Sequence, residues 1–189
     1  MTVDHVRAAH EGLLEQELVY GTLTFGYGGV ELPGQITRQH KPRRRLVTDP
    51  IEAKWVQRVF GWYTGDGLTI GECIRRLNHE QAPLPPRCAT GQWTRQAVRL
   101  LLANPRYRGI WAYGRSEARY LAKQDYVRQF PREQPLKTQQ IERLRIVDDE
   151  TWFRAQALLA KEAPRCGRKA RCVDQRRRPN LLPGPPTKA

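Results

Sequence analysis

The chain has 189 residues, a formal net charge of +14 and a mean hydropathy of −0.70. This length accommodates one domain, or one domain with appended segments, and the 39% of apolar residues suffice for a modest core. The sequence contains no stretch of about 18 apolar residues and no charged-then-apolar start, which excludes a transmembrane helix and a signal peptide. We therefore expect a soluble, cytoplasmic protein with no membrane partner.

The positive charge is mostly arginine, which supplies 26 of the 33 basic residues. The planar guanidinium favours bidentate contacts with phosphates and base edges over diffuse charge. A pI near 10.2 indicates a polyanionic partner, of which nucleic acid is the commonest. We therefore also expect association with the nucleoid. A genome whose codon bias replaces lysine by arginine would give the same composition.

The four cysteines do not have the spacing of a metal site. None belongs to a CxxC pair, and the gap from Cys166 to Cys172 does not fit a zinc knuckle. Cys73 falls among the apolar positions of an expected helix and is interpreted as a small core residue, while Cys88 lies in a loop. We expect no metal and no cofactor.

The expected elements begin with a helix over residues 3–18. A short strand with alternating Leu23 and Phe25 is expected within residues 21–27, before a glycine turn. Residues 31–45 have the composition of a loop.

The loop ends in a basic run of three consecutive arginines, Arg43, Arg44 and Arg45. Such a run is usually a solvated surface. Beside a DNA-reading helix, however, it would contact phosphates, and we expect the same role for Arg106.

Two helices with clear start signals follow. Asp49 is expected to cap the first, with Pro50 at its first position and Glu52 closing a capping box. Thr69 and Glu72 form a second capping box. The apolar and aromatic residues of these helices are assigned to the core or its edge; they include Trp55, Phe60, Trp62, Ile70 and Leu77.

The next helix carries the candidate base-reading residues. Thr94 is its expected N-cap, and the Asn104-Pro105 pair ends it because the residue before proline avoids the α region. Its buried face comprises Val98, Leu101 and Leu102. Its outward face carries side chains of the kinds that read guanine and adenine edges in a major groove. These are Arg95, Gln96 and Arg99, with Gln92 just before the helix.

The two helices around the proline-containing loop at residues 81–91 suggest a helix-turn-helix with a longer than usual turn. A strand over residues 108–114 would act as a wing or a return strand, and a hairpin or loop is expected over residues 115–140. A short strand over residues 144–147 should lead into a helix that begins at Asp148. From residue 164 the chain holds eight lysine or arginine residues and one acid, which predicts a disordered basic tail that binds phosphates.

Several segments, in order, resemble the recombinase domain of large serine recombinases, a family that comprises phage integrases and transposon resolvases. The resemblance covers roughly residues 21–159. The matching segments are Phe25-Gly-Tyr-Gly28, Val47-Thr-Asp-Pro50, Leu68-Thr-Ile-Gly-Glu-Cys-Ile-Arg-Arg-Leu-Asn78, Gly91-Gln-Trp-Thr-Arg-Gln-Ala-Val98, Leu101-Leu-Ala-Asn-Pro-Arg-Tyr-Arg-Gly109 and Ile146-Val-Asp-Asp-Glu-Thr-Trp152. The resemblance implies that the domain binds one half of an attachment site in double-stranded DNA, with the helix after Trp93 in the major groove.

Two departures from the family's pattern affect the expected function. In the family, a catalytic domain whose serine attacks DNA precedes this one, whereas here about twenty residues precede Gly21, and the only serine, Ser116, lacks that domain's sequence around it. The cysteine-rich zinc ribbon of the family is also missing. We therefore expect a middle piece with no catalytic residue and no strand exchange of its own.

The sequence thus predicts an α+β, mainly α, helix-turn-helix domain over residues 21–163, preceded by a linker helix over residues 1–20 and followed by the tail over residues 164–189. Its partners would be double-stranded DNA and, on DNA, a full-length recombinase or a second copy. Two other interpretations stay open. The chain could be a stand-alone DNA-binding regulator or an inert recombinase remnant, or it could be a basic RNA-binding protein.

Overall fold

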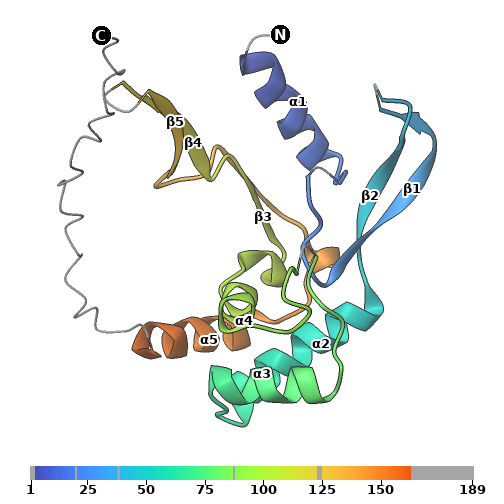
Figure 1. Cartoon of the computed structure of the whole chain (residues 1–189). Coiled ribbons are helices and arrows are strands. Elements are labelled where there is room, and N and C mark those ends of the chain that lie inside the picture. Colours follow the sequence, from blue (N-terminus) through green and yellow to red (C-terminus); the bar gives the residue numbers. More distant parts are fainter. Residues whose placement is uncertain (1–2, 20, 38, 87, 123–124, 163–189) are drawn as a thin grey trace, which may run out of the picture.

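The computed structural model describes residues 3–19, 21–37, 39–86, 88–122 and 125–162 (Figure 1). The tail expected beyond residue 164, with Cys166 and Cys172, lies outside these residues. The described part is α+β, as expected, and its strands pair only in antiparallel fashion. The α-helices are α1 (Val3–Glu15), α2 (Pro50–Phe60), α3 (Ile70–His79), α4 (Arg95–Leu102) and α5 (Asp149–Glu162). The strands are β1 (Tyr27–Ile36), β2 (Pro42–Thr48), β3 (Ile110–Tyr113), β4 (Ser116–Leu121), β5 (Tyr126–Pro131) and β6 (Lys137–Gln140).

The strands form three separate two-stranded ladders, β1–β2, β3–β6 and β4–β5. The β4–β5 hairpin is inserted between β3 and β6, so the excursion expected over residues 115–140 is a hairpin carried by a short ladder. Figure 1 shows β1–β2 and β4–β5 projecting from the part of the molecule that holds α2 to α5. Both hairpins therefore extend beyond the helical core.

The expectation for residues 21–45 was wrong. The first strand begins only at Tyr27 and runs through Gly28 and Gly29, and the basic run expected in a loop lies in β2. Backbone pairing with β2, which no local pattern reveals, holds this glycine-containing strand. The pairing is irregular between Glu31 and Ile36, where the register of the two strands shifts.

The core lies where α2 to α5 meet the start of β1. Its largest fully buried side chains include Phe60, Tyr63, Ile70, Leu77 and Tyr107. A π-helical turn, η1 (Gly61–Gly65), extends α2 and buries Trp62 and Tyr63. The aromatic end of the α2 stripe is therefore core, as its spacing predicted.

Caps fix the ends of the helices. The Asp49 side chain accepts hydrogen bonds from the backbone N–H groups of Ile51 and Glu52, at 2.9 and 3.0 Å. The expected capping box does not form at this helix, because the Glu52 carboxylate instead accepts from the N–H of Gly26 at 2.7 Å. The capping box of Thr69 and Glu72 is present. Burial raises the pKa of Glu52 above its usual value.

The prediction of a strand over residues 144–147 is also wrong. A short 3-10 turn, η3 (Glu142–Leu144), occupies this region. The N–H groups of Ile146 and Val147 both donate to the carbonyl of Tyr107, at 2.8 and 2.9 Å. This segment is therefore held by one carbonyl of the 3-10 turn η2 (Pro105–Arg108) rather than by a strand partner.

Candidate nucleic-acid interface

Helix α4 forms as its sequence predicts. The Thr94 hydroxyl accepts from the N–H of Ala97 at 3.2 Å, and Val98, Leu101 and Leu102 are buried. These three side chains pack α4 against neighbouring helices, among them α2, α3 and α5. Such packing is needed because a helix of eight residues is marginal alone.

Neighbouring elements also fix both ends of α4 by hydrogen bonds. Before the helix, the Asn78 side chain at the end of α3 accepts from the N–H of Trp93 at 2.8 Å and donates to the Trp93 carbonyl at 3.3 Å. After it, Gln156 of α5 donates to the Leu102 carbonyl at 2.8 Å, and Trp152 donates to the Asn104 carbonyl at 3.2 Å. The first and last turns of α4 thus have fixed positions relative to α3 and α5.

The outward side of α4 carries Arg95 and Gln96, both exposed, and Arg99, which is half-buried. At 100° per residue these three positions, with the 60% exposed Leu100, span one continuous sector of the helix. Gln92 is exposed just before the helix. The structure therefore places the four candidate base-reading residues along and just before one accessible helix face.

Arg99 lies between Arg95 and Gln96 in this sector and is the least exposed of the three. It is close enough to Tyr63 to influence that phenol, whose pKa is raised to about 12 by burial and by the nearby Glu162 carboxylate, with Arg99 partly offsetting the rise.

The three arginines of β2 do not share one surface. Successive strand residues point to opposite faces, so Arg43 and Arg45 lie on one face of the hairpin and Arg44 on the other. Arg44 and Arg45 are exposed, while Arg43 is half-buried. The hairpin presents positive charge on both sides instead of as one loop patch.

Arg106 is occupied by contacts within the protein. Its guanidinium lies 4.6 Å from the centre of the Trp111 ring and donates to the hydroxyl of Thr24. It is half-buried. These contacts join η2 to the segment before β1 and leave Arg106 less exposed than Arg44 or Arg45.

A mostly apolar groove of about 400 Å³ runs beside α4. Gln96 and Leu100 line it from α4, and Pro85, Cys88 and Thr90 line it from the loop before the helix. The Cys88 thiol lies 3.4 Å from the Gln92 carbonyl and 3.5 Å from the Thr90 hydroxyl. Hydrogen bonding, with Thr90 the main partner, holds the pKa of Cys88 below its usual value.

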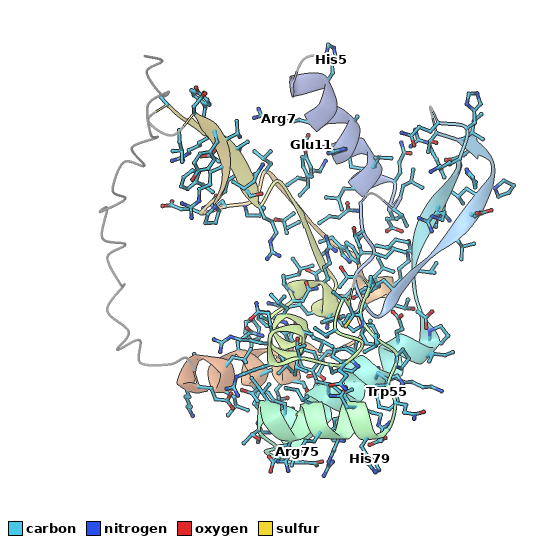
Figure 2. The ribbon with its side chains drawn as sticks, viewed as in Figure 1. His5, Arg7, Glu11, Trp55, Arg75 and His79 are labelled. Carbon is cyan, nitrogen blue, oxygen red and sulfur yellow. The ribbon has the colours of Figure 1, made fainter. Side chains whose placement is uncertain are left out.

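The first helix of the expected pair, α3, has an uncovered outer side. Figure 2 shows Arg75 and His79 pointing outward there. The Arg75 side chain is 78% exposed and lies 3.8 Å from Glu72, one turn earlier. The exposed positions of α3 are thus polar and charged, whereas Ile70, Cys73 and Leu77 face the core.

In the described part of the chain, no group of three or more histidine, cysteine or acidic side chains is arranged to hold a metal ion. Ser116 is exposed at the start of β4, where it pairs with Pro131. None of the helices in these same ranges is both long and apolar enough to cross a bilayer.

The comparison with family models agrees with the sequence resemblance. A family model described as Recombinase matches residues 50–162. No curated protein sequence matches the chain. A solved structure described as "Crystal Structure of a LSR-DNA Complex" is similar at 16% sequence identity and a TM-score of 0.47. The match covers 83% of this chain, which spans only 38% of the length of that one.

Proposed function

Because the chain belongs to the Recombinase family, we propose that residues 21–163 form the DNA-binding module of a site-specific serine recombinase. The module recognises one half of an attachment site in duplex DNA. The observation that carries this proposal is the exposed face of α4, with Arg95, Gln96 and Arg99, on a helix fixed at both ends. Guanidinium and amide groups on a helix positioned in this way can read base edges in a major groove.

In this proposal α3 and α4 are the two helices of a helix-turn-helix. The Asn78 hydrogen bonds to Trp93 fix the second helix relative to the first despite the long connection between them. Helix α4 enters the major groove, and the outer side of α3, with Arg75 and His79, lies nearer the backbone. The β3 strand that follows is the wing.

Sequence-independent affinity comes from the charge outside α4. Arg43, Arg44 and Arg45 contact phosphates from the β1–β2 hairpin, and the net charge of +14 favours all duplex DNA. Arg106 makes a smaller contribution to phosphate binding, because its guanidinium already contacts Thr24 and Trp111.

The proposed role is recognition, without strand cleavage by this chain. The described residues contribute a binding face and a core, and we assign no catalytic residue. We further propose that a full-length recombinase, or a second copy of this chain, binds beside it on the same site.

The first experiment is selection of bound sequences from a random duplex pool at about 0.15 M salt, where non-specific binding is suppressed. An asymmetric enriched sequence supports a half-site reader. Uniform weak binding to every duplex contradicts it and leaves a charge-driven remnant or an RNA-binding protein as the better interpretation. Competition with structured RNA separates these two outcomes.

The selected site then permits a test of the α4 face. Replacing Arg95 by alanine should cost about 1–3 kcal/mol on that site and relax the preference at one or two base pairs. The matched control is Arg154→Ala, which removes an exposed arginine from α5. Equal losses for Arg95→Ala on selected and random DNA would exclude base reading by Arg95.

A further inference from the structure

The β4–β5 hairpin is exposed, and it pairs with no other strand that the structure describes. Its strands pair only with each other, and none of their residues is buried. Tyr120 and Val127, directly opposite each other, are 61% and 60% exposed. An isolated two-stranded hairpin is marginally stable in water, so a projecting one with large exposed side chains indicates a binding surface.

The two faces of this hairpin differ in chemistry. Cross-strand partners lie on the same face, so Arg119, Arg128 and Phe130 share a face with Glu117. We call this set the cationic face. The opposite face carries no charged side chain; its residues are Ser116, Ala118, Tyr120, Val127, Gln129 and Pro131.

The cationic face holds two like charges in direct opposition. Arg119 pairs with Arg128 across the ladder, and each guanidinium carbon lies 5.6 Å from the centre of the Phe130 ring. Glu117 forms an ion pair with Arg119, whereas Arg128 forms none with any residue that the structure describes. Like charges directly opposite destabilise a ladder, and an external anion between them would relieve this repulsion.

The rest of the hairpin holds the cationic face in a fixed shape. Glu117 also lies 3.4 Å from Arg132, and the Tyr120 hydroxyl donates to Asp125 at 2.6 Å across the turn. At its base Gly114 has φ +71, and a Cβ there would lie 2.6 Å from Leu136. Glycine at position 114 thus lets the chain pass close to Leu136 where the hairpin leaves the β3–β6 ladder.

We propose that the cationic face of the β4–β5 hairpin is a second DNA contact, which binds backbone phosphates of the duplex beside the base pairs that α4 reads. This inference depends on the proposed function. Six-residue strands give a ribbon about 20 Å long, enough to follow several phosphates along one groove edge. Charge complementarity favours a phosphate backbone as the occupant, since this face carries two arginines and one acid.

The test compares Arg128→Gln with Arg128→Lys on the selected duplex over a range of salt concentrations. For Arg128→Gln we expect affinity to fall by up to about fivefold, and the slope of log K against log salt to become about 0.9 shallower for one lost phosphate contact. Arg128→Lys keeps the charge and should keep most of the slope. Base preference should not change in either variant.

Gln129→Ala is the matched control, because Gln129 neighbours Arg128 on the uncharged face. It should bind DNA as the parent chain does. Unchanged affinity and salt slope for Arg128→Gln, in a chain that still binds the selected site, overturn the hairpin contact alone. Absence of any site-selective binding by the parent chain would instead defeat the proposed function.

A protein partner is the competing outcome. Val127→Asp places a charge on the uncharged face without touching the cationic one. If this variant dissociates a self-assembled form in sedimentation while Arg128→Gln leaves DNA binding intact, the hairpin docks a second copy and the phosphate assignment is wrong. Normal sedimentation of Val127→Asp with weakened DNA binding by Arg128→Gln supports the assignment.

Discussion

The Tyr27 hydroxyl lies between two backbone carbonyls from distant parts of the chain. It donates to the carbonyls of Arg106 at 2.7 Å and Leu144 at 3.0 Å, while its ring stacks on Tyr107 at a centroid distance of 5.9 Å. Burial raises the pKa of both phenols, so they stay protonated donors at any pH the fold experiences. One side chain at the start of β1 thus joins η2 to η3.

We expect Tyr27→Phe to lower the free energy of unfolding by about 1–3 kcal/mol, because one buried and one partly buried carbonyl lose their shared donor. Urea denaturation of the variant and of Tyr126→Phe, whose ring is 44% exposed on β5, gives the comparison. A cost at Tyr27 no larger than at Tyr126 would show that water or backbone movement satisfies these carbonyls.

The two described cysteines should differ sharply in reactivity. Hydrogen bonding lowers the pKa of the half-buried Cys88 thiol, whereas burial raises that of Cys73 to about 11. In a chain with Cys166 and Cys172 replaced by serine, iodoacetamide should modify Cys88 at neutral pH. The rate should rise with pH and level off at a lower pH than for a free cysteine, since the thiolate is the nucleophile.

Mass spectrometry of the modified chain checks this assignment. Cys73 should stay unmodified from pH 6 to pH 9 in the folded protein and react only after denaturation. Modification of Cys73 at a rate comparable to Cys88 under native conditions would mean that α3 opens readily.

At the scale of elements, a glycine permits the close approach between η2 and the segment after β6. Gly109 has φ +81, and a Cβ at this position would lie 2.9 Å from the carbonyl oxygen of Ile141. Gly67 has a similar φ of +67 but open space around it. Substitutions at the two positions therefore distinguish the cost of backbone strain from the cost of a steric clash.

Gly67→Ala should cost about 1–2 kcal/mol for the left-handed conformation alone. Gly109→Ala should cost a further 1–3 kcal/mol or so, because the added methyl group meets backbone that cannot turn away. Thermal or urea unfolding of the two variants measures the difference. Equal costs would indicate that residues 109 and 141 separate without penalty.

The sequence predicted those elements whose signals are local. Thr69 and Thr94 begin helices because a hydroxyl that accepts from a first-turn N–H needs no distant partner. The apolar spacing of Val98, Leu101 and Leu102 likewise placed the buried face of α4, and with it the outward residues. The candidate base-reading face was therefore accessible to sequence reasoning.

Elements held by distant partners were missed. The β1 strand contains glycines and a proline, and its stability comes from pairing with β2, so residues 31–45 were mistaken for a loop. The residues around Ile146 in the sequence are typical of a strand, yet the N–H of Ile146 donates to the carbonyl of Tyr107. The hydrogen bonds of Asn78 and Gln156 that fix α4 were also missed, since neither residue type at these positions indicates its partner.

At the scale of the whole molecule, the net charge of +14 should destabilise the compact state through self-repulsion. Raising sodium chloride from about 10 mM to 0.5 M shortens the Debye length well below the size of the domain. We expect the melting temperature to rise, by roughly 2–4 °C for each kcal/mol of repulsion relieved.

Scanning calorimetry without DNA measures this effect. Exposed ion pairs such as Arg58 with Glu80 are screened by the same salt, but each contributes little to stability. A melting temperature that falls with salt would mean that these pairs together outweigh the net repulsion.

The β3–β6 ladder brings together the two ends of the segment that lies between these strands. Tyr113 at the end of β3 lies opposite Lys137 at the start of β6, so the 23 residues between them begin and end at adjacent backbone positions. Because its two ends are adjacent, such a segment can change in length or in sequence among related chains while the helical core and α4 keep their geometry. The proposed phosphate contact of this arm can thus diversify during evolution independently of α4, the proposed base-reading helix.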